Sequence, residues 1–471
     1  MVTATITKHS KLTDSLPEGL FTMNSFIRNV TWCVLATLIL GTRPARSLAN
    51  PEIPGAPQEK PIALVGGTIH PISGPVIHNG TLLFDKGRIV RLGKDIPIPA
   101  DSQVINIKGK HVYPSLFDSM TNTGLVEVKA VRASVDEAET GTVNPNVKAQ
   151  VAVNPDSELI PVTRSNGVLL VLTAPTGGTI SGQAAVMQLD GWTWENMTLK
   201  PAVGMIVKWP NMAAVSDWWV KKSAKQQIES REKSLKTLHE TFDQAEAYRQ
   251  ARLAKVKDQA QDSRWEAMIP VLTGKQPIIV QANEIQQIQA AVAFASKRNL
   301  KMILFGGYDA PRCAPLLKQH QIPVIVGGVY QLPRRRHDPY DDAYTLPERL
   351  RQQGIKFCIS SFGRFGAANV RNLPYHAAVA AAFGLPEDEA LKAITLSPAE
   401  ILGVDQRVGS LQPGKDATLI ITTGNPLETT TQVEQAFIQG RRVALNDRHK
   451  RLWRKYQQKY QQLKKNAAVQ P

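Results

Sequence analysis

From Pro161 onward, short apolar runs rich in β-branched residues alternate with longer helix-like segments. Continuous apolar strands between helices are typical of parallel strands that are buried on both faces. Repetition of this unit over roughly 250 residues favours a closed barrel over an open sheet. The sequence therefore predicts an α/β protein built on a TIM-like (β/α)8 barrel, which we place at residues 113–407. The apolar runs are 167–172, 204–207, 277–280, 301–305, 323–326 and 356–359.

Strand-like patterns flank this barrel on both sides. After an extended linker at residues 50–61, short apolar runs punctuated by Gly, Pro and Asn-Gly fill residues 62–112, which is typical of a small antiparallel sheet or sandwich. Strand-like runs return at 414–422 and 433–443. We expect these runs to complete the first sheet, so that a small discontinuous β-sandwich forms from residues 62–112 plus 408–446.

A polar segment at about 213–270 interrupts the barrel pattern. It is nearly free of Gly and Pro and is rich in Lys, Gln, Glu and Ala. Its apolar residues recur at steps of three and four, which predicts one or two helices that pack on the barrel through a single stripe. A dedicated partner-binding helix is the alternative. The stripe consists of Leu235, Leu238, Phe242, Ala245 and Tyr248.

The chain is basic, with a formal net charge of +16 over 471 residues. Many of the cations lie in the C-terminal segment 447–471, which we expect to be a basic helical tail. No recognised nucleic-acid module accompanies the charge, so we expect no nucleic-acid partner. A solvated helix near an acidic partner or lipid head groups is the interpretation that the tail favours.

Residues 1–49 have the features of a signal peptide. Arg28 precedes the apolar run Val30–Leu40, and the small-x-small sequence Ser47-Leu48-Ala49 follows it. We expect cleavage after this sequence and export to a bacterial periplasm or cell surface. An uncleaved signal would instead act as a membrane anchor. The polar segment before Met23 lacks signal character, which suggests an over-long start.

The mature chain would keep two cysteines, Cys313 and Cys358. They lie in segments predicted to be a barrel helix and a barrel strand, and no CxxC spacing is present. We expect two buried free thiols, with a single disulfide as the alternative.

Three stretches resemble the amidohydrolase superfamily, in particular its imidazolonepropionase-like branch of metal-dependent hydrolases. Gly109–Leu125 (GKHVYPSLFDSMTNTGL) resembles the family's passage into the first barrel strand. Gly274–Pro323 is similar in layout to barrel strands five and six. Ala390–Pro426 contains GSLQPGKDA, which is highly characteristic of the family's return from the barrel to the β domain. The resemblance covers nearly the whole mature chain.

The metal-ligand motifs of the family are degenerate here. The resemblance implies a divalent metal such as zinc, held by His-x-His on strand one and by histidines on strands five and six, with an Asp on strand eight. Zinc sites are built from Cys, His, Asp and Glu. Asp118, just before the lost His-x-His, keeps its place, and Asn122 follows it. The positions that replace the ligands carry Ser119, Thr121, Gln281, Asn283, Phe305 and Ser361. We therefore expect no metal cofactor.

Two further residues are candidates for chemistry near the barrel mouth. Lys208 ends a predicted strand, where some relatives place a carbamylated lysine between two metals. His376 begins the helix after strand eight. Without histidine partners, a metal-bridging lysine is disfavoured, and a packing or capping histidine is the common alternative for the second residue.

These observations favour an exported amidohydrolase homologue without catalysis, or with impaired catalysis, that acts as a binding or assembly module. The catalytic residues stay unassigned. A small polar molecule bound at the barrel mouth, a homo-oligomer, or a hetero-oligomer with an active homologue would be its partners. The alternative is an active hydrolase of carbon–nitrogen bonds, in non-peptide or cyclic amides, that uses a noncanonical site.

Overall fold

The computed structural model of the protein describes residues 53–216, 220–363 and 366–469. The predicted signal peptide lies outside these residues, as does the start of the predicted linker. Within the described ranges, no helix is both long and apolar enough to cross a membrane.

Eight strands form one nearly closed barrel sheet, and they follow each other around the sheet in chain order. The first and last strands meet where the Ser119 hydroxyl donates to the Ile359 carbonyl at 3.3 Å. This architecture confirms the mixed α/β fold with a TIM-like barrel. The strands are β6 (Leu116–Thr121), β7 (Val168–Thr173), β8 (Ile180–Gln188), β9 (Thr198–Lys208), β10 (Ile278–Ala282), β11 (Met302–Gly306), β12 (Val324–Val326) and β13 (Phe357–Ile359).

The barrel departs from a strict (β/α)8 repeat at β8. This strand runs antiparallel to both of its neighbours, β7 and β9, whereas the other pairs in the barrel are parallel. The connection 174–179 is far shorter than the crossover that two parallel strands need. β8 was not among the predicted strands, because its residues, ISGQAAVMQ, combine Gly and Gln with small apolar residues. Residues 174–179, which include Gly177 and Gly178, are thus a hairpin connection between two barrel strands.

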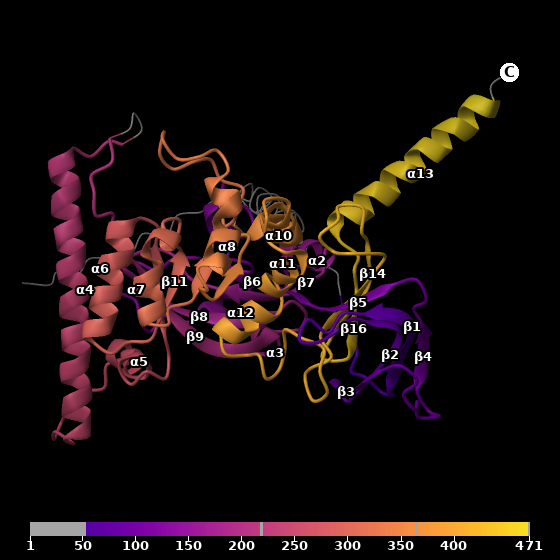
Figure 1. The fold of residues 1–471 in the computed structure, drawn as a ribbon, viewed down its shortest axis with the longest axis horizontal. Coiled ribbons are helices and arrows are strands. Elements are labelled where there is room, and N and C mark those ends of the chain that lie inside the picture. The colour runs from indigo at the N-terminus through magenta and orange to yellow at the C-terminus, as the bar shows by residue number, and fades with distance from the viewer. Residues whose placement is uncertain (1–52, 217–219, 364–365, 470–471) are drawn as a thin grey trace, which may run out of the picture. The chain divides into compact units, whose positions relative to one another are not determined.

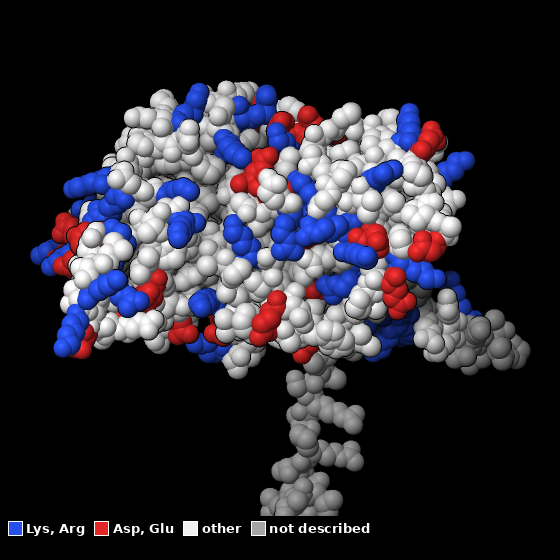
Figure 2. Space-filling model, turned by 90° about the horizontal axis from the view of Figure 1, so that it is seen from below, with Lys and Arg blue, Asp and Glu red and all other residues white. Residues whose placement is uncertain are grey.

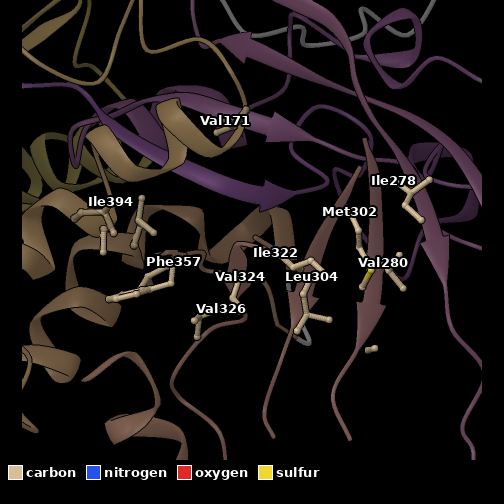
Figure 3. Packing of buried hydrophobic residues seen from close by; sticks show 14 of the residues in the cluster. Val171, Ile278, Val280, Met302, Leu304, Ile322, Val324, Val326, Phe357 and Ile394 are labelled. Atoms are coloured by element: carbon tan, nitrogen blue, oxygen red, sulfur yellow. The ribbon is translucent and has the colours of Figure 1, made fainter. Parts of the chain in front are cut away.

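Alternate residues of the barrel strands face two different cores. Ile279, Ile303, Ile325 and Cys358 belong to a cluster that fills the barrel interior. The intervening side chains pack in a larger cluster with the surrounding helices. Figure 3 shows part of this larger cluster, in which Val280, Leu304 and Val324 project from neighbouring strands. This alternation is the geometry expected of buried parallel strands.

Short helices cover the outside of the barrel (Figure 1). These short α-helices are α2 (Leu159–Arg164), α3 (Trp194–Met197), α6 (Ile285–Lys297), α7 (Ala314–Gln319), α8 (Asp342–Gln352), α9 (Gly366–Asn369), α10 (Leu373–Ala382), α11 (Glu387–Ala393) and α12 (Leu396–Ile401). Single 3-10 turns occupy Arg132–Ser134, Ala149–Ala152, Ala310–Cys313 and Val370–Asn372.

The polar segment between β9 and β10 holds two helices, α4 (Ala224–Leu253) and α5 (Ser263–Leu272). Ser223 caps α4, because its hydroxyl accepts from the Gln226 amide while the Gln226 side chain accepts from the Ser223 amide. One stripe of α4 is buried, and Phe242 packs edge-to-face on Phe294 of α6. The long helix therefore lies on the barrel surface, as its sequence pattern predicts.

A second sheet is built from both ends of the described chain, in the order β16-β15-β14-β5-β1-β2-β3, with β4 also paired to β1. The antiparallel pair β5–β14 joins the two ends. Phe84 and Phe437, on strands far apart in this order, meet edge-to-face at 5.2 Å, so the sheet curls around one apolar core. Its strands are β1 (Ile62–Ile69), β2 (Ile77–Asp85), β3 (Arg88–Gly93), β4 (Gln103–Asn106), β5 (His111–Pro114), β14 (Leu419–Thr422), β15 (Val433–Ile438) and β16 (Arg441–Val443). A two-layered sandwich, and the domain limits drawn around it, stay predictions.

The last helix, α13 (Arg448–Val469), follows this sheet and extends away from it (Figure 1). The two cysteines of the described chain, Cys313 and Cys358, are buried free thiols, which confirms that expectation. On the face drawn in Figure 2, basic and acidic side chains are interspersed rather than gathered into one basic groove.

Candidate ligand site at the barrel mouth

Asp118 connects the first and last barrel strands. Its carboxylate is fully buried and accepts hydrogen bonds from the Met120 amide at 3.2 Å, from the Ser361 amide at 3.2 Å and from the Ser361 hydroxyl. Burial raises the pKa of Asp118 to about 7, although these hydrogen bonds act in the opposite direction. The contact between Asp118 and Ser361, which are 243 residues apart in sequence, closes the barrel.

The hydroxyl groups that replace the His-x-His motif are used within the barrel wall. Ser119 is fully buried and donates to the Ile359 carbonyl. Thr121 is also buried, and its hydroxyl lies 3.0 Å from that of Thr123. Beside Ser119, burial raises the pKa of the Cys358 thiol to about 12, so this thiol stays protonated at neutral pH. These buried groups contact one another and the backbone within the barrel wall.

Asn122 follows β6 and is almost entirely buried. Its amide nitrogen donates to the Glu137 carboxylate, while its amide oxygen has no hydrogen-bond partner within the described part of the chain. Gly366 approaches this oxygen closely, since a Cβ at that position would lie 2.5 Å from it. Asn122 therefore lies between Glu137, to which it donates, and the start of α9, which it closely approaches.

The strand-five and strand-six positions are also occupied by residues that do not bind metals. Gln281 is half-buried at the end of β10. Asn283 lies just beyond it and shapes the turn, because its backbone amide donates to the Gln287 side chain at 3.0 Å. Phe305 belongs to the interior cluster and packs edge-to-face on Phe362, with ring centroids 5.1 Å apart. This aromatic pair fills the barrel below the mouth.

The donor set at these positions does not fit a zinc ion. Neutral hydroxyls, amides and a phenyl ring replace the imidazole and carboxylate ligands that zinc requires. Across the described ranges, no group of three or more His, Cys, Asp and Glu side chains could hold a metal ion. The single carboxylate that keeps its place, Asp118, is engaged in hydrogen bonds to Ser361 and Met120.

His376 lies apart from these residues and has a packing role. It is buried on α10, its Nδ1 atom accepts from the Val329 amide at 3.1 Å, and its ring lies against Tyr330. Burial lowers the pKa of His376 to about 4, so the imidazole is neutral at physiological pH. Its neighbour Gly328 has no room for a side chain, because a Cβ there would lie 2.9 Å from the imidazole.

Lys208 does not join the buried groups around Asp118 but lines a separate cavity. It is exposed at the carboxyl end of β9 and lines a cavity of about 290 Å³ between the β7–β8 connection and α4. Within the described residues, its ammonium group makes no hydrogen bond or ion pair. Two further cations line the same cavity: Lys222, which donates to Ser230 at 3.1 Å, and Arg231, which donates to the Met212 carbonyl at 2.7 Å.

The structure thus separates two sets of predicted site residues. Asp118, Ser119, Thr121 and Ser361 are brought together but are buried, whereas Lys208 lines an open cavity. The other polar groups of this cavity, which come from α4 and the loop before it, were not predicted from the sequence. One feature of the sequence could have indicated these groups: the polar segment that carries them begins directly after the strand that ends in Lys208.

Comparisons with known proteins agree with this architecture. The model of the amidohydrolase family matches residues 301–443. The amidohydrolase tasK of Hapsidospora irregularis is 20% identical over 404 residues, which cover 77% of this chain and 39% of that protein. An imidazolonepropionase of Mesorhizobium japonicum is 26% identical over 179 residues, or 38% of this chain and 40% of that protein. The chain thus spans about two fifths of the length of these curated relatives.

Among solved structures, an amidohydrolase from Thermotoga maritima superposes with a TM-score of 0.72 at 23% identity. The match covers 81% of this chain and 99% of that one, so the two share a fold. The sequence match and the barrel architecture therefore agree: residues 301–443 match the amidohydrolase family, and the chain has the fold of the Thermotoga maritima amidohydrolase.

Proposed function

We propose that this protein is a non-catalytic member of the amidohydrolase superfamily. Its barrel would serve as a binding module. One observation carries the proposal: the positions that would supply metal ligands on four strands hold hydroxyl, amide or phenyl side chains, which are not the ligands that zinc requires. Among them, Ser119 donates to a backbone carbonyl and Phe305 packs on Phe362. A barrel of this design needs no metal to be stable, so we propose no metal cofactor.

The ligand of such a module would be a small anion at the cavity beside Lys208. Three cations line the cavity, and Lys208 has no counter-ion within the described chain. The polar groups of Asn211 and Ser234 would supply hydrogen bonds beside them. At about 290 Å³, the cavity lies at the lower end of the range for small-molecule sites, so a compact carboxylate or phosphate compound fits best.

Binding can be tested with a panel of small carboxylates and inorganic phosphate, followed by thermal shift and calorimetry. We expect at least one carboxylate to bind, and Lys208→Ala and Arg231→Ala each to weaken it about tenfold or more, because a hydrogen bond to a charged group is worth about 1.5–3 kcal/mol. The matched control is Lys225→Ala, an exposed lysine of α4 outside the cavity. If Lys208→Ala, Arg231→Ala and the control Lys225→Ala bind the carboxylate equally well, this cavity is not the binding site.

The second candidate is an active hydrolase of carbon–nitrogen bonds that uses Asp118 and Ser361. It is favoured by the contact between the two side chains and by the pKa of about 7 for the carboxyl group. It is disfavoured by their burial, since neither side chain is more than 3% exposed. A panel of amides, cyclic imides and dipeptides tests it: turnover that Ser361→Ala abolishes would establish the hydrolase and overturn the binding module.

Export and assembly are further parts of the proposal. The mature protein would begin at Asn50, which N-terminal sequencing of the protein from its host's cell envelope can check. Copurification would show whether it forms a homo-oligomer or a hetero-oligomer with an active homologue. A protein that starts upstream and stays in the cytoplasm would contradict export.

A further inference from the structure

The base of α13 is fixed to the rest of the chain. The buried Asp447 carboxylate accepts from the Lys450 amide at 2.9 Å and caps the helix. Arg451 forms an ion pair with Glu158 at 2.8 Å, and Arg371 contacts His449 at 3.1 Å. The direction in which α13 leaves the fold is therefore set by specific contacts within its first turn.

Beyond Arg451, the described part of α13 has no packing partner. Every residue from Leu452 to Lys464 is exposed, although five of these side chains are large and apolar or aromatic. Trp453 is 62% exposed and Tyr460 is 60% exposed. These five side chains are Leu452, Trp453, Tyr456, Tyr460 and Leu463.

The five side chains lie along one face of the helix. At 3.6 residues per turn, their positions fall within an arc of about 100°, which is the width of a stripe that contacts a surface. No charged residue from Leu452 onward falls inside this arc. Lys459 and Lys464 border it on either side, and the Lys459 ammonium lies 5.8 Å from the Tyr456 ring centroid and 6.0 Å from that of Tyr460.

The remaining circumference is strongly basic. The sequence of α13, RHKRLWRKYQQKYQQLKKNAAV, contains eight Lys and Arg and no Asp or Glu. An aromatic stripe bordered by lysines, on a helix of low mean hydropathy, is the pattern of helices that lie in the plane of a membrane interface. The rings would enter the head-group region while the lysines reach anionic phosphates.

We propose that α13 docks this protein onto an anionic lipid surface. Charge complementarity favours this occupant, since the helix has cations on both sides of its apolar stripe. A second copy of the chain is disfavoured, because pairing two stripes would bring two such basic helices together. The helix would lie on the surface rather than cross it. This inference is independent of the ligand proposed for the barrel.

The test is cosedimentation of the full chain with phosphatidylcholine vesicles, with and without phosphatidylglycerol, at low and high salt. We expect binding only to the anionic vesicles, weakened by salt. The charge variant Lys455→Gln/Lys459→Gln/Lys464→Gln should lower the partition coefficient about 100-fold, at a factor of roughly five for each lysine near an anionic surface.

A second variant separates the apolar stripe from general charge attraction. Trp453→Ser/Tyr456→Ser/Tyr460→Ser should lose at least about tenfold in partitioning, because the buried apolar area sets much of the affinity. The matched control, Gln457→Ser/Gln461→Ser on the polar face, should bind like the unchanged chain. All variants should keep the thermal unfolding midpoint of the parent, since these side chains contact no other element.

Three outcomes would overturn the proposal. One is absence of binding to anionic vesicles at low salt. Another is equal binding of the stripe variant and its control to anionic vesicles, which would mean that the charge of the helix alone causes binding. The third is concentration-dependent dimerisation that the stripe variant abolishes while vesicles are ignored, which would assign the face to a second copy of the chain.

Discussion

The buried carboxyl group of Asp118 makes the most specific prediction about the site. Asp118→Asn should keep a hydrogen bond at each of the contacts of this carboxyl group, with the direction of the bond to the Ser361 hydroxyl reversed. The amide oxygen would accept from the Met120 and Ser361 amides, as one carboxylate oxygen does now. The amide nitrogen would take the place of the other oxygen and donate to the Ser361 hydroxyl. The substitution therefore removes the ability to ionise without creating a cavity.

The magnitude follows from the pKa. The pKa of Asp118 rises from 3.8 to about 7 on folding. Between these values the unfolded chain has lost the proton while the folded chain keeps it, so the free energy of unfolding falls as pH rises. Above pH 7 the full penalty, about 4 kcal/mol as an upper bound, opposes folding. Asp118→Asn should therefore stabilise the protein above pH 7 and have little effect near pH 4.

The assay is urea unfolding of both proteins at several pH values between 4 and 8, with the difference in unfolding free energy plotted against pH. Asp101→Asn, at an exposed position, is the matched control. Asp118→Ala should destabilise near pH 4, where the native carboxyl group is neutral, because the backbone donors lose their acceptor. A flat difference for Asp118→Asn, or a loss of stability at pH 8, would refute the interpretation of Asp118 as a desolvated wall residue.

Three further predictions concern stability. Asp190→Ala should cost about 3–5 kcal/mol in urea unfolding, because it removes the buried carboxylate that pairs with Arg164 at 3.0 Å and with Arg441 at 2.8 Å; a cost below about 1 kcal/mol would contradict this. Phe242→Ala should cost about 3 kcal/mol and speed hydrogen exchange in α4, whose buried stripe it belongs to; unchanged exchange would show that α4 is held by other contacts. Burial and the neighbouring His111 lower the pKa of His70 to about 4, so the contribution of His70 to the free energy of unfolding should fall as pH drops from 6.5 toward 4; His70→Gln should remove that contribution from the pH profile, and an unchanged profile would contradict this.

The barrel could be predicted from the sequence because its parallel strands are short runs of β-branched residues between helices. β8 could not, since its Gly, Gln and Ala residues match neither strand nor helix patterns well, and its direction depends on the short connection before it. The joining of both chain ends in one sheet followed from strand-like patterns at each end and is seen in the β5–β14 pair.

The site was less predictable for a physical reason. The sequence identifies which residues follow each strand, and so Asp118 and Ser361 could be assigned to the barrel mouth. Whether a side chain there is open or closed off depends on packing between distant segments, such as Phe305 against Phe362. The cavity at Lys208 depends on where α4 docks, which no local pattern determines.

The central claim is that the barrel mouth of this amidohydrolase-fold protein no longer forms a metal site. The direct measurement is the metal content of the purified full chain after incubation with zinc and removal of free ions by gel filtration. We predict much less than one zinc per chain, with no change on Gln281→Ala. One zinc retained per chain, and lost when Ser119 or Gln281 is replaced by alanine, would contradict the account.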